Sequence, residues 1–236
     1  MMARIVNEDE YAIKRNEILN VAQRLVFAKG FEQMSIQDIL DELHISKGAF
    51  YHYFDSKVAL LDGLLDRMMD DAEGLLRPIV EDKNLPALEK VQRFFSVASR
   101  WKTDRKSFML DLLRVWYNDA NALARQKQET TYVQRIAPML AEIVHQGIAE
   151  GTMNTAYPNQ VGGMLWGLAQ GIEDDIAEML LAERLPEDAL QRLESIMGAY
   201  AEAIERILGA PAGSLPLADV DILKEWIEQP AREKIA

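Results

Sequence analysis

The chain has 236 residues, 49% of them hydrophobic, with a net charge of −12 and no cysteine. This length allows one large helical domain or two small ones, and the lack of cysteine excludes disulfides, thiolate catalysis and zinc–sulfur sites. The first ten residues lack the apolar stretch of a secretory signal, and the longest apolar run, residues 161–169, is too short to cross a bilayer. We therefore expect a cytoplasmic protein with no membrane partner.

The acidic charge is unevenly distributed. Residues 1–60 hold 7 Lys or Arg and 9 Asp or Glu, whereas the remainder holds 19 and 29. Within residues 44–57, Lys47 and Lys57 outnumber the single acid, Asp55. Because phosphates attract cations, this segment suits a nucleic-acid partner, while the total charge argues against tight non-specific binding.

Helical periodicity runs through nearly the whole chain and predicts an all-α protein of about ten helices without a sheet. Gly30 is suited to end the first helix, and the apolar pattern of the fourth stops before Pro78. A short amphipathic tail follows the Pro/Gly/Ala linker at residues 209–216. We expect helices at about residues 9–29, 36–43, 47–53, 56–76, 84–102, 104–118, 121–150, 158–182 and 186–208, and a tail helix after 218.

The second and third helices carry the most informative segment, residues 35–57. Ser35 can cap the first of them, with Asp38 at capping-box spacing, and Ser46 can cap the second. Small residues at a helix start let the backbone approach base edges, so we predict a helix-turn-helix that places a helix in the major groove of DNA. The side chains left exposed on it are Lys47, Gly48, Ala49, Tyr51, His52 and Tyr53.

This segment resembles the TetR family of bacterial repressors. The shared signature is a short helix, a turn ending in Ser-Lys-Gly, then Tyr-x-Tyr/His-Phe and a Ser-Lys helix start, here spanning Ile45 to Lys57. With Gly30-Phe31 and residues 35–39, the resemblance covers about residues 11–65. His44 departs from the family, which more often has a small residue before the turn.

The resemblance implies a role for each matching residue. It implies phosphate contacts from Ser35, Tyr51, Tyr53 and Lys57, with Gln37 as a further candidate. It implies base-edge or groove contacts from Lys47, Gly48, Ala49 and His52. It also implies a three-helix DNA-binding domain at residues 1–55 and a larger ligand-binding and dimerisation domain at 56–208, followed here by a linker and short helix at 209–236.

The middle of the chain is rich in large apolar side chains, most of them expected in ordinary core. The resemblance implies a small-molecule pocket in this region, and its composition predicts a bulky, largely apolar effector. The candidate lining residues are Phe94, Trp101, Phe108, Met109, Leu112, Trp116, Met139 and Trp166, with Gln170, Glu173 or Asn118 as a polar contact. Residues 173–175 and Glu178 form an acidic group that suits a cationic ligand or a metal, but a solvated helix face is the favoured interpretation. With only three histidines, we expect no metal and no cofactor.

Gly163, Gly167 and Gly171 recur every four residues along one face of the helix at 158–182. Because a glycine inside a helix costs roughly 1 kcal/mol relative to alanine, this face predicts the close approach of another helix, from the same chain or from a twofold-related copy. The last long helix offers Leu193, Met197, Tyr200 and Ile204 as an apolar stripe. The resemblance implies that these two helices form the interface of a homodimer.

We therefore expect a TetR-like repressor that binds a pseudo-palindromic operator as a dimer and is released by a small, largely apolar ligand. Two other classes stay open. A protein of this fold can serve as an architectural or cell-division factor without a responsive ligand, and an all-α enzyme is the third reading. No nucleophile–base pair, phosphate-cradling glycine loop or metal spacing favours an enzyme.

Overall fold

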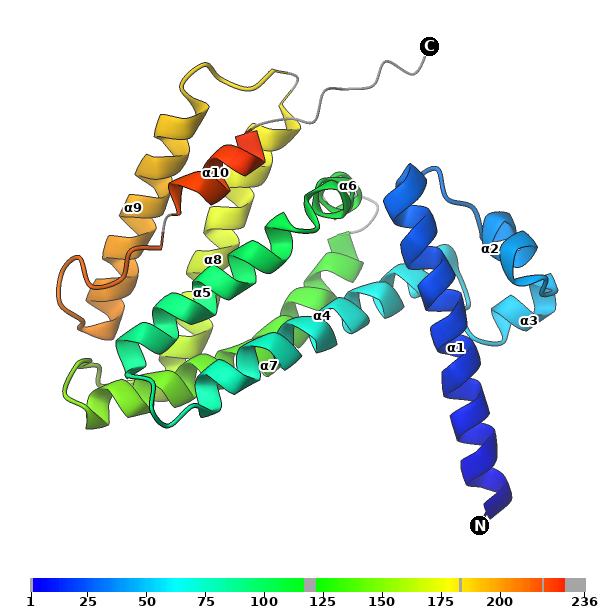
Figure 1. The fold of residues 1–236 in the computed structure, drawn as a ribbon, viewed down its shortest axis with the longest axis horizontal. Coiled ribbons are helices and arrows are strands. Elements are labelled where there is room, and N and C mark those ends of the chain that lie inside the picture. The colour runs from blue at the N-terminus through cyan, green and yellow to red at the C-terminus, as the bar shows by residue number, and fades with distance from the viewer. Residues whose placement is uncertain (1, 117–121, 183, 218, 228–236) are drawn as a thin grey trace. The chain divides into compact units, whose positions relative to one another are not determined.

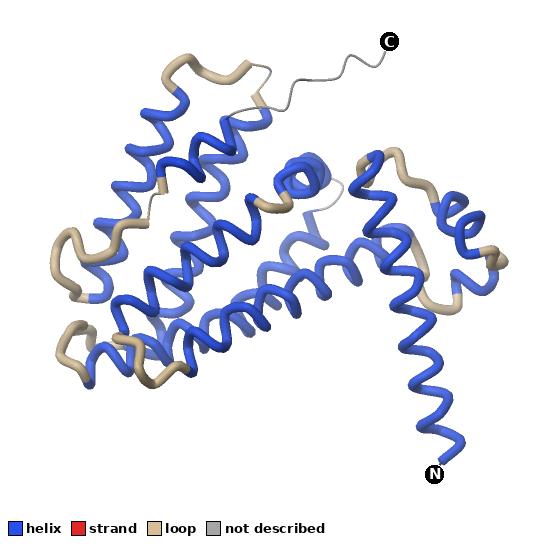
Figure 2. Tube along the Cα trace, in the orientation of Figure 1, coloured by secondary structure: helices blue, strands red, loops and turns tan. Residues whose placement is uncertain are grey.

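The computed structural model describes residues 2–116, 122–182, 184–217 and 219–227. These residues form ten α-helices and no β-strand (Figures 1 and 2), which confirms the predicted all-α fold. The helices are α1 (Met2–Lys29), α2 (Ile36–Leu43), α3 (Lys47–Tyr51), α4 (Lys57–Glu81), α5 (Ala87–Thr103), α6 (Lys106–Trp116), α7 (Ala122–Ala149), α8 (Pro158–Leu181), α9 (Ala189–Leu208) and α10 (Val220–Ile227).

Two predicted helix boundaries are wrong by more than three residues. α1 begins at Met2 rather than near residue 9, because residues 2–8 contain no Gly or Pro to stop it. α4 continues through Pro78 to Glu81 instead of ending near residue 76. Proline lies here in the last turn, where its missing N–H removes a single helical hydrogen bond. The Pro78 carbonyl still accepts the N–H of Asp82 at 3.1 Å.

The chain divides into two compact units. The N-terminal unit consists of residues 1–70 and 107–125, and the C-terminal unit of residues 71–106 and 126–236. The helix α4 is continuous from one unit into the other. The predicted functional boundaries at residues 55 and 208 stay predictions.

In the N-terminal unit, α1, α2, α3 and the first half of α4 each turn an apolar face inward. α2 packs against both α1 and α3. The ring of Phe108 in α6 lies 5.2 Å from that of Phe27 in α1, so α6 also packs in this unit. Almost fully buried side chains in the core of this unit include Ile18, Ala22, Val26, Ile39, Phe50, Leu60 and Leu64. The two short helices therefore pack on a hydrophobic core that lies within the N-terminal unit.

In the C-terminal unit, α8 lies alongside α9, and α10 packs on α9 and on α5 (Figure 1). Met179, Leu193 and Leu223 form part of one buried cluster that joins α8, α9 and α10. Trp226 of α10 donates its Nε1–H to Thr103 Oγ1 at 2.8 Å, and Arg100 of α5 lies 2.8 Å from the Glu225 carboxylate. The tail helix therefore packs against its own chain.

The linker that leads to α10 is held by a buried carboxylate. Glu205 of α9 is only 6% exposed and accepts the N–H groups of Gly213 at 2.9 Å and Leu215 at 2.8 Å. Gln92 of α5 donates to the carbonyl of Ser214 at 2.7 Å. Because a buried charge needs hydrogen-bond partners, these bonds fix the path of the linker.

None of the helices described combines the length and the apolar character that a membrane crossing requires.

Candidate nucleic-acid interface

The first short helix, α2, begins at a capping box. Ser35 Oγ accepts the N–H of Asp38 at 3.2 Å, and the Asp38 carboxylate accepts the N–H of Ser35 at 2.7 Å. Lys29 Nζ lies 2.6 Å from the same carboxylate. The hydrogen bond from Lys29, followed by those from Ser35, holds the pKa of Asp38 well below its usual range. The predicted cap is therefore confirmed, and it fixes the start of the helix that carries Gln37.

The turn between α2 and α3 depends on a left-handed residue. His44 has a φ of 53°, and its N–H donates to the Leu40 carbonyl, which ends α2. Glycine and asparagine adopt this conformation at lower cost than histidine. Ser46 then caps α3, where its Oγ accepts the N–H of Ala49 at 3.1 Å. The departure of His44 from the resemblance thus falls at the one position in the turn where the backbone favours a small residue.

Helix α3 is anchored from one side and open on the other. Phe50 is fully buried and Phe54, just after the helix, is 3% exposed. Lys47, Gly48, Tyr51 and His52 are exposed, whereas Ala49 and Tyr53 are half-buried. The apolar spacing predicts Ile45, Phe50 and Phe54 as anchors; Phe50 and Phe54 are buried as expected, whereas Ile45 is half-buried. Four of the six side chains expected to face solvent are fully exposed.

A hollow of 480 Å³ lies between the start of α2 and the exposed side of α3. Five of the nine residues predicted to contact DNA line it: Ser35, Gln37, Lys47, Tyr51 and Lys57. The Ser35 hydroxyl donates to the Asp38 carboxylate at 2.7 Å, so the donors left for a ligand are the Gln37 amide, the Tyr51 hydroxyl and the two lysines. Such donors around one concave surface suit an anionic group such as a phosphate. The structure thus brings together residues that are up to 22 positions apart in the sequence.

The two lysines at this hollow differ in their surroundings. Lys57 Nζ donates to the Glu32 carbonyl at 3.1 Å and lies 4.5 Å from the centre of the Phe31 ring. Burial lowers the pKa of Lys57, although two of its three N–H donors remain for another acceptor. Lys47 is exposed and lies 5.9 Å from the centre of the Tyr51 ring. Lys47 forms no ion pair with any described residue, so it is the more available cation.

Gly48 is open to its surroundings. Among the described residues, a Cβ atom at this position would meet only Ser46 Oγ, at 3.9 Å, which is ordinary van der Waals contact. No described neighbour therefore requires a glycine here, although glycine weakens a helix. The open face of α3 is what the close approach of a base edge would need.

His52 and Tyr53 contact Tyr11, a residue outside the predicted DNA-binding set. The ring of Tyr11, in α1, lies 5.6 Å from that of His52 and 4.8 Å from that of Tyr53, and the latter two rings are 5.0 Å apart. Helical spacing could have indicated that Tyr11 continues the inward-facing side of α1, because it precedes the buried Ile18 by two turns and lies on the same face.

The residues predicted to line a ligand pocket are divided between the units. Phe108, Met109 and Leu112 of α6 belong to the N-terminal unit, and the side chain of Trp116 and residue Asn118 lie outside the described part of the chain. In the C-terminal unit, Met139 is fully buried and Phe94 and Trp101 are 4% and 9% exposed. Trp166, Gln170 and Glu173 are half-buried, and Glu173 is already paired with Lys102.

Trp101 differs from the other residues of this group. Its Nε1–H is buried and has no hydrogen-bond partner among the described residues. The Arg105 guanidinium lies 4.5 Å from the centre of the Trp101 ring and donates to the Trp101 carbonyl at 3.2 Å. Buried donors are nearly always paired in folded proteins, so this indole is a candidate to bind an acceptor from outside the chain. In the part of the chain that the structure describes, no three His, Asp or Glu side chains gather as a metal site would need.

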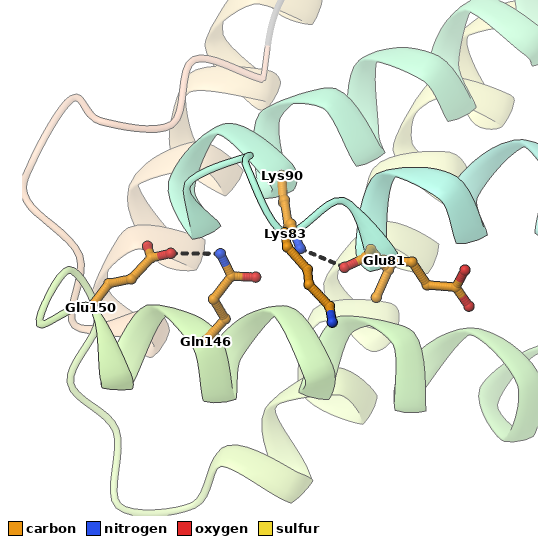
Figure 3. Close-up of a pocket in the computed structure, with 6 residues that line it drawn as sticks. Glu81, Lys83, Lys90, Gln146 and Glu150 are labelled. Atoms are coloured by element: carbon orange, nitrogen blue, oxygen red, sulfur yellow. Dashed lines mark hydrogen bonds between the residues drawn. The ribbon is translucent and has the colours of Figure 1, made fainter.

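A hollow of 740 Å³ in the C-terminal unit is lined by none of the predicted pocket residues. It lies where α4, α5 and α7 meet, and its polar groups bind the chain itself (Figure 3). Lys90, which is 2% exposed, donates to the carbonyl of Val80 at 2.5 Å, and Glu150 accepts the N–H of Ala87 at 2.9 Å. Hydrogen bonds from Gln146 and from Ala87 lower the pKa of Glu150. These groups complete two helix ends, so the hollow is a structural joint.

The residues predicted for a dimer interface also separate into two groups. Leu193 and Ile204 are fully buried in the core of their own chain, and Gly171 lies against Tyr200, whose hydroxyl would be 2.5 Å from a Cβ atom there. Tyr200 donates to Asp175 at 3.3 Å, and burial raises its pKa. Met197 packs against the cluster of α8, α9 and α10.

Gly163 and Gly167 are exposed, and a Cβ atom at either would lie more than 4 Å from every described atom outside its own stretch of helix. The glycine that meets another helix of the same chain is Gly162, which lies outside the predicted four-residue repeat. A Cβ atom there would lie 2.1 Å from the carbonyl oxygen of Ala137 in α7.

Comparison with known proteins gives a family match at the helix-turn-helix. The profile of "Bacterial regulatory proteins, tetR family" matches residues 18–64. The HTH-type transcriptional repressor KstR2 of Rhodococcus jostii (strain RHA1) is 37% identical over 67 residues, which are 28% of this chain and 33% of that protein. KstR2 of Mycobacterium tuberculosis (strain ATCC 25618 / H37Rv) is 27% identical over 142 residues, 58% of this chain and 68% of the repressor. The match thus spans about a third of the first repressor and about two thirds of the second.

Solved structures extend the likeness to most of the chain. A TetR-family transcriptional regulator from Pectobacterium atrosepticum has a TM-score of 0.61 at 18% identity, covering 86% of this chain and 98% of its own. NemR of E. coli in its reduced form has a TM-score of 0.55 at 16% identity, covering 84% and 98%. At these identities the likeness concerns the fold.

Proposed function

We propose that this chain, a member of the TetR family of helix-turn-helix transcriptional regulators, is a repressor that binds a pseudo-palindromic operator as a homodimer. It releases the operator on binding a small, largely apolar ligand. In this proposal α3 enters the major groove, and the hollow between α2 and α3 receives a backbone phosphate.

The observation that carries the proposal is the grouping of Ser35, Gln37, Lys47, Tyr51 and Lys57 around one hollow beside an open Gly48. The donors supply a phosphate site, and the glycine leaves the helix backbone accessible to bases. A helix pair that served only to build the core would gain nothing from an unpaired lysine and a glycine on its exposed side.

The direct test is selection of binding sites from a randomised DNA pool, followed by titration of the selected duplex with Lys47→Ala. Loss of this phosphate or guanine contact should weaken binding about tenfold and reduce the slope of log affinity against log salt by roughly one. Lys83→Ala removes the same charge from an exposed turn of the C-terminal unit and should leave binding unchanged. Equal effects of the two substitutions, or selection of no preferred sequence, would contradict the proposal.

The dimer is proposed to form through the exposed face of α8. Gly163 and Gly167 offer a surface on which a second copy can pack closely, and Met164 between them is 50% exposed. Gly167→Glu should therefore dissociate the dimer, as measured by light scattering during gel filtration. Gly74→Glu is the matched control, since a Cβ atom at this exposed glycine of α4 also meets no described residue within 4 Å. Loss of the dimer with both substitutions, or with neither, would count against this surface.

The ligand is proposed to bind in the C-terminal unit with a hydrogen-bond acceptor at the Trp101 indole. The unpaired Nε1–H supports this polar contact better than Glu173, which is paired with Lys102. Release of the selected duplex can be titrated with fatty acids, aromatic ketones and hydrocarbons of matched size. Compounds with an acceptor should release DNA at lower concentration, and Trp101→Phe should abolish that advantage. If none of these compounds releases the DNA, the architectural role without an effector becomes the better interpretation.

A further inference from the structure

The aromatic cluster of Tyr11, His52 and Tyr53 joins the first helix to the end of the DNA-reading helix. Tyr11 and His52 meet edge to face at an interplanar angle of 81°, and Tyr11 and Tyr53 pack with their rings tilted by 38°. Edge-to-face packing is an arrangement that aromatic pairs favour, and the ring centres of both pairs lie within the usual contact range of about 4.5–7 Å. The cluster lies at the surface, since Tyr11 is 38% exposed and His52 is exposed.

Helix α3 does not by itself orient these two residues. It has five residues, and His52 and Tyr53 come after its last one. The N–H of His52 donates to the Gly48 carbonyl at 3.2 Å and that of Tyr53 to the Phe50 carbonyl at 2.9 Å, which fixes their backbone. A helix this short is marginal in isolation, so the directions of the side chains depend on contacts from elsewhere.

Helix α1 supplies those contacts from a fixed position. The Arg15 guanidinium, one turn after Tyr11, lies 5.0 Å from the centre of the Phe54 ring. Its Nη2 would be 3.0 Å from a Cβ atom at Gly63, so Arg15 is packed closely against α4. Further along the same face, Ile18 and Ala22 are buried in the core. Tyr11 is therefore the N-terminal member of the anchored stripe that continues through Arg15, Ile18 and Ala22. It contacts the two residues that follow the C-terminal end of α3.

We propose that Tyr11 is a positioning residue of the DNA-binding surface, whose ring holds His52 and Tyr53 in the orientation in which they meet DNA. The inference rests on the proposed function, in which His52 faces the groove and Tyr53 a phosphate. Tyr11 acts through its ring, because both contacts are made by the aromatic face or edge. The ring is thus the part that a test must remove.

The first test needs no DNA. The chain has three histidines, so the ring protons of His52 can be assigned by substitution and followed by NMR. They should carry ring-current shifts that Tyr11→Ala removes and that Tyr11→Phe retains. Ile13→Ala is the matched control, because Ile13 is 58% exposed and lies on another face of α1. Unchanged His52 shifts in Tyr11→Ala would overturn the inference.

The second test uses the duplex that the wild-type protein selects from a random pool. Tyr11→Ala should weaken binding to this duplex about 3- to 10-fold. Each aromatic pair that the substitution removes corresponds to a factor of roughly 2 to 12 in an equilibrium constant, and the expected loss of affinity lies within that range. Tyr11→Phe and Ile13→Ala should bind within about twofold of wild type. In the background His52→Ala with Tyr53→Ala, adding Tyr11→Ala should change the affinity less than twofold.

The two kinds of failure are distinguishable. An equal effect of Tyr11→Ala in both backgrounds would mean that Tyr11 contacts DNA itself, and would overturn the positioning role while leaving the proposed function intact. Unaltered binding in Tyr11→Ala would overturn the inference in the same way. Selection of no preferred sequence by the wild-type protein would overturn the proposed function, and with it the role of Tyr11.

Discussion

The helix-turn-helix and the C-terminal helix pair α8–α9 are specified by the sequence in different ways. Helices α2 and α3 have 8 and 5 residues, and each begins at a serine whose side chain accepts a backbone N–H. Helices α8 and α9 have 24 and 20 residues, and neither has a side-chain cap. Short helices depend on local signals at their ends, whereas long helices depend on what covers their length.

The glycines of the two regions show the consequence. Gly48 is open because the five-residue helix around it is anchored on one face by Phe50 and exposed on the other. In α8, Gly162 is enclosed by α7, while its neighbour Gly163 is open. In a long helix the spacing of glycines alone does not tell which of them meets its own chain.

The largest expected effect separates these two neighbours. Gly162→Ala would place a Cβ atom 2.1 Å from the Ala137 carbonyl oxygen, so α7 and α8 must move apart. We expect a loss of about 3 kcal/mol in the free energy of unfolding, the upper range for overpacking. In the Gly167→Glu background, which is expected to be monomeric, Gly163→Ala should instead raise the free energy of unfolding by about 0.5–1 kcal/mol through helix propensity, because the added Cβ meets no described atom outside its own stretch of helix. Urea denaturation measures both, and two changes of the same sign would contradict the account of α8.

Local and long-range signals also explain how much of the molecule the sequence predicts. The caps at Ser35 and Ser46, the anchors Phe50 and Phe54 and the exposed Lys47 follow from spacing within 20 residues, and the structure bears them out. Most helix boundaries follow from the periodicity of apolar residues. The continuation of α4 through Pro78 does not, because a proline in the last turn costs too little to end a helix.

Contacts between distant segments were beyond prediction for a different reason. Three such contacts depend on how distant segments pack against each other. Tyr11 packs on His52, Phe31 lies against Lys57, and α7 encloses Gly162. Apolar periodicity shows which face of a helix is buried, but not which neighbour lies on it. The apolar stripe of α9 illustrates the limit, since Leu193 and Ile204 are buried within the chain itself.

The second prediction concerns the open glycines of the two regions. In the described part of the chain, the methyl group of Gly48→Ala would meet one atom, at 3.9 Å, and that of Gly198→Ala in α9 would meet none within 4 Å. Both should raise the free energy of unfolding by up to about 1 kcal/mol. Only Gly48→Ala should weaken binding to the selected duplex, by about tenfold, because the added methyl group lies between the helix and the bases. Unchanged DNA affinity in Gly48→Ala would remove the functional explanation for this glycine.

The third prediction compares two histidines. His44→Gly relieves a left-handed backbone at the end of α2 and should stabilise the protein by about 0.5–1 kcal/mol, after allowance for the greater freedom of glycine in the unfolded chain. His145→Gly, inside α7, should destabilise it by about 1 kcal/mol, and it also loses the 2.7 Å contact with Asn159. Thermal unfolding distinguishes the signs. A loss of stability in His44→Gly would show that its side chain contributes to the turn.

The smallest expected effect is a pH dependence at the start of α2. The pKa of Asp38 is lowered in the folded protein, chiefly by Lys29 and then by Ser35, so the carboxylate stabilises the fold above its unfolded pKa of about 3.9. That contribution is lost as the pH falls through the folded pKa. Asp38→Asn should therefore lower the melting temperature at pH 7 and pH 5 by similar small amounts, and the difference from wild type should shrink below pH 4. Because the carboxylate and Lys29 are both in contact with solvent, 0.5 M salt should reduce the difference as well.

Glu73, whose pKa is lowered by Arg135 in the C-terminal unit, gives the matched comparison through Glu73→Gln. Here the ion pair joins α4 to α7 and is not part of a cap, so Glu73→Gln should leave DNA binding intact whereas Asp38→Asn should shift it through the position of Ser35. A difference between wild type and Asp38→Asn that grows on acidification would contradict the assigned sign.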